Sequence, residues 1–162
     1  MMEMVRPMRA WLPALLIIAA VGAFDLSTIR AGHEWGDDFA LYVLHAKNIE
    51  QGTDYARTGF IFNPAYPRIT WRWPPVFPLL LAPVVRARGV DLRAMQVEVA
   101  CLFTLTLAAI ALAFKSELSA GAVAAVIAIV GFNFHFWDAT DQVMADIPFT
   151  VCGRSRACRS SN

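Results

Sequence analysis

Charged side chains are scarce in this sequence, and the two signs nearly cancel. Asp, Glu, Lys and Arg make up 17% of the 162 residues, and 14 basic against 13 acidic side chains leave a formal net charge of +1. Soluble domains carry about 25% charged residues, so the composition is not typical of one. The charge balance also argues against a nucleic-acid partner, because no basic stripe alternates with aromatic residues.

Cysteine is also scarce. Cys101 lies within an apolar run, and Cys152 and Cys158 lie near the C-terminus. Three separated cysteines give neither the even count of a disulfide framework nor the paired spacing of a zinc site. We therefore predict no disulfide and no cysteine-held metal.

Hydrophobic residues are abundant, at 57% of the chain, and they gather in long runs. Because a membrane-spanning helix needs about 20 mostly apolar residues, we predict spans at residues 10–29, 94–114 and 118–136. The first run follows Arg6 and Arg9 and so also fits a signal peptide. It lacks a clean cleavage site, however, and we expect a retained helix. The predicted fold is an all-α integral membrane protein with about three transmembrane helices.

A long polar and aromatic segment, residues 30–93, separates the first two predicted spans. Part of it has apolar residues at helical spacing: Phe39, Tyr42, Val43, Ala46 and Ile49. The spacing predicts a juxtamembrane amphipathic helix of about three turns, with Asp37 or Asp38 as N-cap and Gly52 as the stop. We expect His45 on the polar flank of this helix.

The apolar run at residues 74–85 has only 12 residues and an internal Pro78. A run this short is more typical of an interfacial or re-entrant helix than of a span. With three spans, the long loop and the segment after the third span share one side of the membrane. Arg6, Arg9 and Lys115 favour a cytoplasmic N-terminus. We therefore expect a multi-pass protein of the cell (inner or plasma) membrane, with an extracytoplasmic loop at residues 30–93.

The pair Asp37–Asp38 is the sharpest chemical feature of the loop. At the start of a helix, both acids fit capping and a favourable interaction with the helix dipole. They also fit a general base, or ligands for a divalent metal ion, at the lipid–water boundary. His33 is a candidate to join Asp37 in such a metal site. These interpretations are compatible with one another.

Four segments together resemble the membrane glycosyltransferases of the C superfamily (GT-C), which include protein O-mannosyltransferases and the lipid A aminoarabinose transferase. Residues 36–42 (GDDFALY) and 45–52 (HAKNIEQG) are similar to the acidic pair and helix of their first extracytoplasmic loop. Residues 73–83 (WPPVFPLLLAP) are similar to their Pro-Pro motif, and residues 146–148 (DIP) to a later acidic motif. Aminoarabinose-type members carry a Lys where this chain has Trp73.

The resemblance implies a sugar transferase that acts with inversion at the non-cytoplasmic face. Its donor would be a polyprenyl-phosphate-linked sugar and its acceptor a lipid, a glycan or a protein. Asp37 would be the general base or would position a divalent metal, Asp38 would assist, and Asp146 would be the second acid. Arg72 and Arg68 would contact the donor phosphate.

After Val151 the composition changes abruptly from apolar to basic. We expect residues 1–151 to be the N-terminal part of a GT-C-like transmembrane domain. Residues 152–162 would be an aberrant or disordered tail, as in a truncated or frameshifted product. The alternative function is a non-catalytic membrane protein, such as an assembly or transport subunit, whose acids only cap helices. Glu98, within the second span, leaves a transport role open.

Overall fold

The computed structural model describes residues 8–32, 38–58 and 74–146, and every regular element in these ranges is a helix. Several predictions concern residues outside these ranges: His33, Asp37, Arg68, Arg72 and the tail at 152–162. The elements, in chain order, are η1 (Met8–Trp11), α1 (Leu12–Ser27), α2 (Asp38–Glu50), α3 (Val76–Arg88), α4 (Leu92–Phe114), α5 (Ala120–Gly131) and α6 (Phe134–Thr140). The predicted all-helical fold is confirmed for the described residues.

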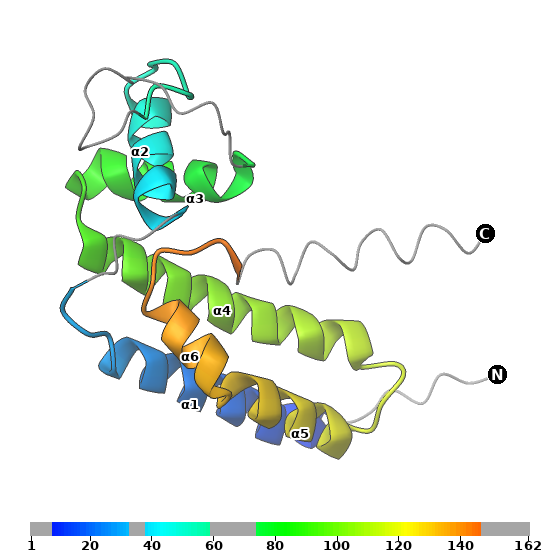
Figure 1. The fold of residues 1–162 in the computed structure, drawn as a ribbon. Helices are drawn as coiled ribbons and strands as arrows, with labels where there is room; N and C mark the ends of the chain where they lie inside the picture. Colours follow the sequence, from blue (N-terminus) through cyan, green and yellow to red (C-terminus); the bar gives the residue numbers. More distant parts are fainter. Residues whose placement is uncertain (1–7, 33–37, 59–73, 147–162) are drawn as a thin grey trace, which may run out of the picture.

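Helices α1, α4 and α5 form a three-helix bundle (Figure 1). Two glycines allow its backbones to approach closely. A Cβ on Gly22 would lie 2.8 Å from Oγ1 of Thr104, and one on Gly131 would lie 2.6 Å from Cγ2 of Val21. Small residues at helix crossings are characteristic of helices packed within membranes.

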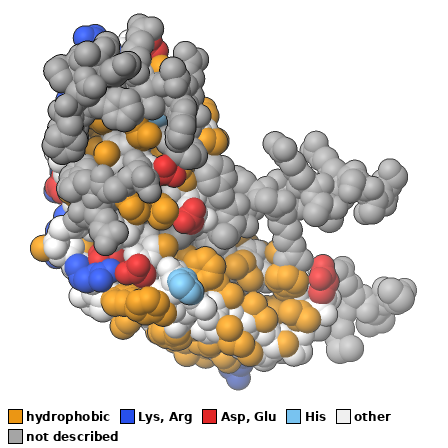
Figure 2. Space-filling model, in the orientation of Figure 1, with side chains coloured by type: hydrophobic (Ala, Val, Ile, Leu, Met, Phe, Trp, Pro, Cys, Tyr) orange, Lys and Arg blue, Asp and Glu red, His pale blue; other side chains and the backbone are white. Residues whose placement is uncertain are grey.

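Two stretches are long and apolar enough to cross a membrane, Arg9–Ser27 and Leu92–Phe114. They match the predicted first and second spans. The outward faces of the bundle are hydrophobic as well as its core, since Leu15 is 58% exposed, Leu105 64% and Ile129 72%. Figure 2 shows hydrophobic side chains gathered over this part of the molecule. A surface of this kind is expected where lipid is the solvent.

The third predicted span, at residues 118–136, is not one straight helix. Helix α5 ends at Gly131, and α6 follows after a bend of 60°. The side chain of Asn133 accepts a hydrogen bond from the backbone N–H of His135 at 2.9 Å, so it caps α6 and starts a new helix direction. The bent pair passes the length and hydropathy test for a span only when it is taken together.

Helices α2 and α3 pack against each other beside the first turns of α4 (Figure 1). Helix α2 forms where the sequence predicts a helix, and Gly52 behind it has a φ of +63°, which favours glycine. Its buried side chains include polar His45 and Asn48, so the helix is less clearly amphipathic than predicted. Helix α3 has 13 residues, so it reaches only about 20 Å. It is shorter than a span, in agreement with its prediction as a non-spanning helix.

Candidate functional site

The candidate site consists of Asp38, Tyr42 and Asp146, which we call the acid–tyrosine site. Asp38 is the first residue of α2, and Tyr42 lies one helical turn later on the same face. Asp146 comes from the segment that follows α6. Burial raises the pKa of Tyr42, and the negative charges of Asp38 and Asp146 add to the effect. Two acids that are far apart in sequence therefore both act electrostatically on this one side chain.

Tyr42 is buried within this site and packs against a neighbouring ring. It is 5% exposed, and its ring meets Phe77 of α3 edge-on, with 5.1 Å between centroids. Burial is the main cause that raises the pKa of Tyr42 to about 12, and the two carboxylates add to the effect. The phenol thus stays protonated at neutral pH and can donate a hydrogen bond.

Asp146 owes its position to the residues before it. Val143 and Ala145 are buried at 0% and 2% exposure, whereas Asp146 is exposed. The segment therefore alternates between core-facing and outward-facing side chains, which anchors its backbone and presents the carboxylate. Whether Asp146 caps a further helix depends on residues from 147 onward, outside the described ranges.

Four predicted site residues, Asp37, His33, Arg68 and Arg72, lie outside the described residues, and so does the predicted metal pair of Asp37 and His33. Within the described ranges, no group of three or more His, Cys, Asp or Glu side chains is arranged to hold a metal ion. Asp38 and Asp146 are the two predicted site residues that the structure describes. The sequence reasoning treated Tyr42 only as an apolar position of the helix. Its spacing of four residues from Asp38 was the available indication of a polar role.

The prediction for His45 was wrong, because this side chain is fully buried rather than on a polar flank. Its Nδ1 lies 2.7 Å from the carbonyl oxygen of Tyr55, and the two rings stack 4.0 Å apart. Since a carbonyl only accepts, Nδ1 carries the proton. Burial lowers the pKa of His45. Asn48, one turn on, donates to the carbonyl oxygens of Tyr55 and Arg57. The buried polar side chains of α2 thus hold the following loop.

A second polar group, which we call the arginine network, joins the start of the long loop to α6 and the residue after it. The prediction of three spans places these two segments on the same side of the membrane. Nη2 of Arg30 donates to Asp138 at 2.7 Å, and its Nε and backbone N–H donate to Asp141. The guanidinium lies over the Trp137 ring, 5.1 Å from the centroid. The hydrogen bonds to both carboxylates raise the pKa of Arg30. The start of the long loop and the end of α6 therefore share one end of the bundle, as expected.

Gln96 of α4 completes this network. Its side-chain amide donates to the carbonyl oxygens of Gly32 and Asp141, at 3.1 and 2.8 Å. The sequence alone predicted no role for Gln96 or for Arg30. The contacts are between residues far apart in the chain, so no local pattern indicated them.

Two acids in the predicted spans stand apart from both groups. Asp25 is 2% exposed, and both of its carboxylate oxygens are buried without a partner among the described residues. One carboxylate oxygen of Glu98 is likewise buried without a hydrogen-bond partner among the described residues. A buried ionised carboxylate without a partner is very unfavourable.

No protein-family model, curated protein or solved structure significantly matches this chain.

Proposed function

We propose that this chain is part of a membrane glycosyltransferase of the C superfamily. It would move a sugar from a polyprenyl-phosphate donor to an acceptor at the non-cytoplasmic membrane face, with inversion. The observation that supports the proposal is that Arg30, at the start of the long loop, binds Asp138 and Asp141, while Asp38 and Asp146 both act electrostatically on the buried Tyr42. In the family that the sequence resembles, acids from the first loop and from the segment after the third span lie on the same face of the protein.

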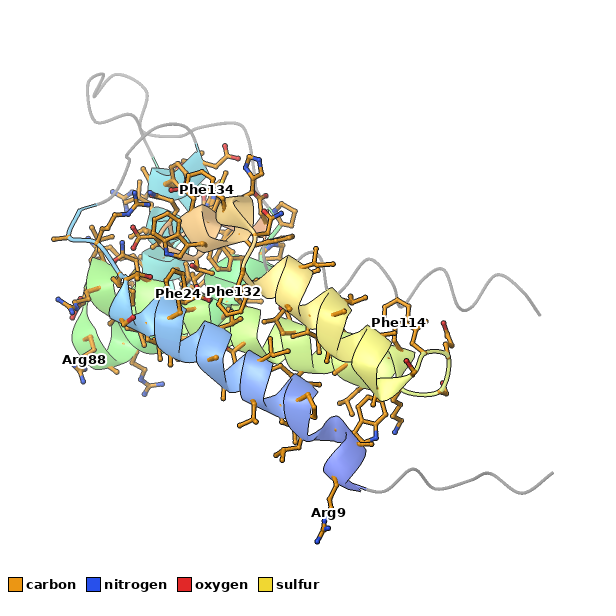
Figure 3. The ribbon with its side chains drawn as sticks, turned by 90° about the horizontal axis from the view of Figure 1, so that it is seen from below. Arg9, Phe24, Arg88, Phe114, Phe132 and Phe134 are labelled. Atoms are coloured by element: carbon orange, nitrogen blue, oxygen red, sulfur yellow. The ribbon has the colours of Figure 1, made fainter. Side chains whose placement is uncertain are left out.

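The distribution of aromatic side chains supports the membrane location. Phe24, Phe132, Phe134 and Trp137 cluster at the loop end of the bundle, with ring centroids 5.5–6.3 Å apart. Trp11 lies at the other end of α1. Figure 3 shows Phe24 and Phe132 at the loop end and Arg9 at the opposite end. Aromatic residues at both ends of an apolar body are typical of membrane interfaces.

In the proposed reaction, a carboxylate of the Asp37–Asp38 pair takes the proton of an acceptor hydroxyl or amine. The acceptor atom then attacks the anomeric carbon of the sugar, and the bond from that carbon to the phosphate oxygen breaks. The electron pair leaves with the polyprenyl phosphate, and the proton stays on the aspartate. Arg68 and Arg72 would stabilise the charge that develops on the phosphate. The protonated phenol of Tyr42 would orient a carboxylate by hydrogen bonding.

The test is sugar transfer in membranes that contain the protein expressed from its complete gene, with polyprenyl-phosphate-linked mannose or aminoarabinose as donor. Release of polyprenyl phosphate is the readout, because it does not depend on which acceptor is used. Asp37→Asn is expected to lower the rate by about 10²–10⁴-fold, the usual contribution of a general base. Asp38→Asn should lower it less. Glu50→Gln is the matched control, since Glu50 is exposed at the far end of α2.

The alternative function is a non-catalytic membrane subunit, and the arginine network favours it in one respect. Asp138 and Asp141 show that acids at this end of the bundle serve structure. If Asp38 does the same, Asp38→Asn is harmless, because Asn caps a helix as well as Asp does. Full donor turnover by both Asp37→Asn and Asp38→Asn would favour this alternative and contradict the catalytic role.

A further inference from the structure

A groove between the first turns of α1 and the last turns of α4 lies at the end of the bundle away from the long loop. Its volume is about 340 Å³, within the range of about 300–1,000 Å³ of small-molecule sites. Its lining includes Trp11, Leu15, Ile18, Ala111, Leu112 and Lys115. The walls are almost entirely apolar, and Lys115, which is exposed just after α4, is the charged residue among those that line the groove.

The groove is open to the surroundings of the bundle rather than to its core. Leu15 is 58% exposed and Leu112 is 65% exposed. Both lie on stretches that are long and apolar enough to cross a membrane. In a bilayer the molecules that reach such a groove are therefore lipids. Ala111 leaves space on the α4 side that a larger side chain would fill.

The charged side chains that the structure describes at this end of the bundle are Arg9, Lys115 and Glu117, all exposed, with a net charge of +1. Lys115 is exposed directly after α4, and Arg9 is exposed at the start of the first predicted span. Figure 3 shows Arg9 and Phe114 at this same end. A second copy in the same membrane orientation would bring its own Lys115 and Arg9 to the same depth, where like charges repel. A lipid with an anionic headgroup instead complements both cations.

We propose that this groove binds one acyl chain of an anionic membrane phospholipid, with the phosphate headgroup held by Lys115. The site is separate from the one proposed for the polyprenyl-phosphate donor, which lies at the loop end. The proposal rests on the membrane location that is part of the proposed function. It does not depend on sugar transfer.

The experiment uses the whole chain in phosphatidylcholine vesicles with a small fraction of phosphatidylglycerol that carries a photoreactive diazirine on its acyl chain. Cross-linked peptides are identified by mass spectrometry. We expect cross-links on the groove segments of α1 and α4, about fivefold more than with the matching phosphatidylcholine probe, as one lysine near an anionic headgroup provides. Equal labelling by the two probes would overturn the proposal.

Two pairs of variants locate the effect. Ala111→Phe should fill the groove and remove its cross-links, whereas Ala113→Phe, on an exposed position outside the lining, should retain them. Lys115→Gln should abolish the preference for phosphatidylglycerol, and Lys47→Gln on α2 should not. Because Lys115 is exposed, its replacement tests the proposal even if Ala111→Phe fails to fold.

The outcomes separate this proposal from the proposed function. Flotation with the vesicles measures membrane location independently. A chain that floats but shows no groove cross-links contradicts the lipid site alone. Protomer–protomer cross-links at the groove that Ala111→Phe abolishes would assign it to a second copy and overturn the lipid. Loss of sugar transfer in Asp37→Asn has no bearing on either result.

Discussion

The bundle of α1, α4 and α5 and the pair of α2 and α3 are stabilised in different ways. The bundle buries apolar side chains around Val21, Phe103, Leu107 and Ile127, yet its outward faces are hydrophobic too. The α2–α3 pair instead buries the polar side chains of His45 and Asn48 and satisfies most of their hydrogen-bonding groups. A helix with apolar residues on all sides needs an apolar medium. A buried polar side chain needs a fixed partner.

The difference indicates where chemistry can be placed. Positions in the bundle are set by the close fit of small residues, and the buried acid Asp25 has no partner there among the described residues. The α2–α3 pair holds Tyr42 and His45 in defined polar surroundings. In the proposed enzyme, the bundle would serve as the support, and the start of α2 would present the reactive groups.

Overpacking should harm the bundle most. Gly131→Ala puts a methyl group 2.6 Å from Val21 and 3.3 Å from Leu107, so we expect a loss of about 1–3 kcal/mol in the free energy of unfolding. Gly121→Ala is the control, since nothing lies within 4 Å of its Cβ. It should stabilise α5 by about 0.5–1 kcal/mol. Thermal unfolding in detergent measures both, and equal melting temperatures would contradict the close packing of α1 on α5.

The α2–α3 pair should respond to pH through His45. Burial lowers the pKa of this imidazole below 6.5, so the unfolded chain binds the proton more readily than the folded one. The stabilising contribution of neutral His45 is complete above about pH 6.5 and is lost as the pH falls below it. His45→Leu should cost about 1 kcal/mol at neutral pH, for the lost hydrogen bond to Tyr55.

The cost of His45→Leu should shrink as the pH is lowered from about 7.5 to about 5.5. In that range the unfolded wild-type chain takes up a proton at His45, which lowers the stability of the wild type but not that of the variant. Unfolding followed by far-UV circular dichroism at several pH values provides the measurement. His135→Gln is the control, since His135 is exposed. A pH-independent gap between wild type and His45→Leu would contradict the buried neutral imidazole.

The sequence allowed prediction of those elements that local patterns determine. Helix α4 follows from its apolar length, and α2 follows from helical spacing that ends at Gly52. The break between α5 and α6 was not predictable from hydropathy, because the apolar run continues through it. The helix breaks at Asn133 because its side chain accepts a hydrogen bond from the backbone N–H of His135. A local bond of this kind competes with the backbone hydrogen bonds of a continuing helix.

The candidate site was predictable only in part, for a similar reason. The acids Asp38 and Asp146 stood out by their motifs. Their shared electrostatic effect on the buried Tyr42 depends on how α2 and the segment after α6 are placed, and a local pattern contains no information on that placement. The prediction of His45 on the polar flank was wrong because its hydrogen-bond partner, the carbonyl oxygen of Tyr55, comes from the loop after the helix.

The arginine network lies between the two regions and should show the smallest effect. Arg30→Lys keeps the positive charge but loses the fork that binds Asp138 and Asp141 and the contact with Trp137. Because the Arg30 side chain is 52% exposed, we expect a loss of only about 0.2–1 kcal/mol. Arg88→Lys, on an exposed arginine at the end of α3, is the matched control in the same thermal assay. A larger loss in Arg88→Lys than in Arg30→Lys would argue against the network.

The central claim is that acids from the first loop and from the segment after α6 meet on the non-cytoplasmic side of a membrane. The direct test is cross-linking of Asp38→Cys with Asp146→Cys in oriented membrane vesicles, in a chain whose three native cysteines are replaced by serine. A short, membrane-impermeant bis-maleimide should join the two positions when added from the non-cytoplasmic side. It should not join Asp38→Cys to Lys115→Cys, which lie at opposite ends of the molecule. Absence of the first cross-link, or its formation only from the cytoplasmic side, would contradict the account.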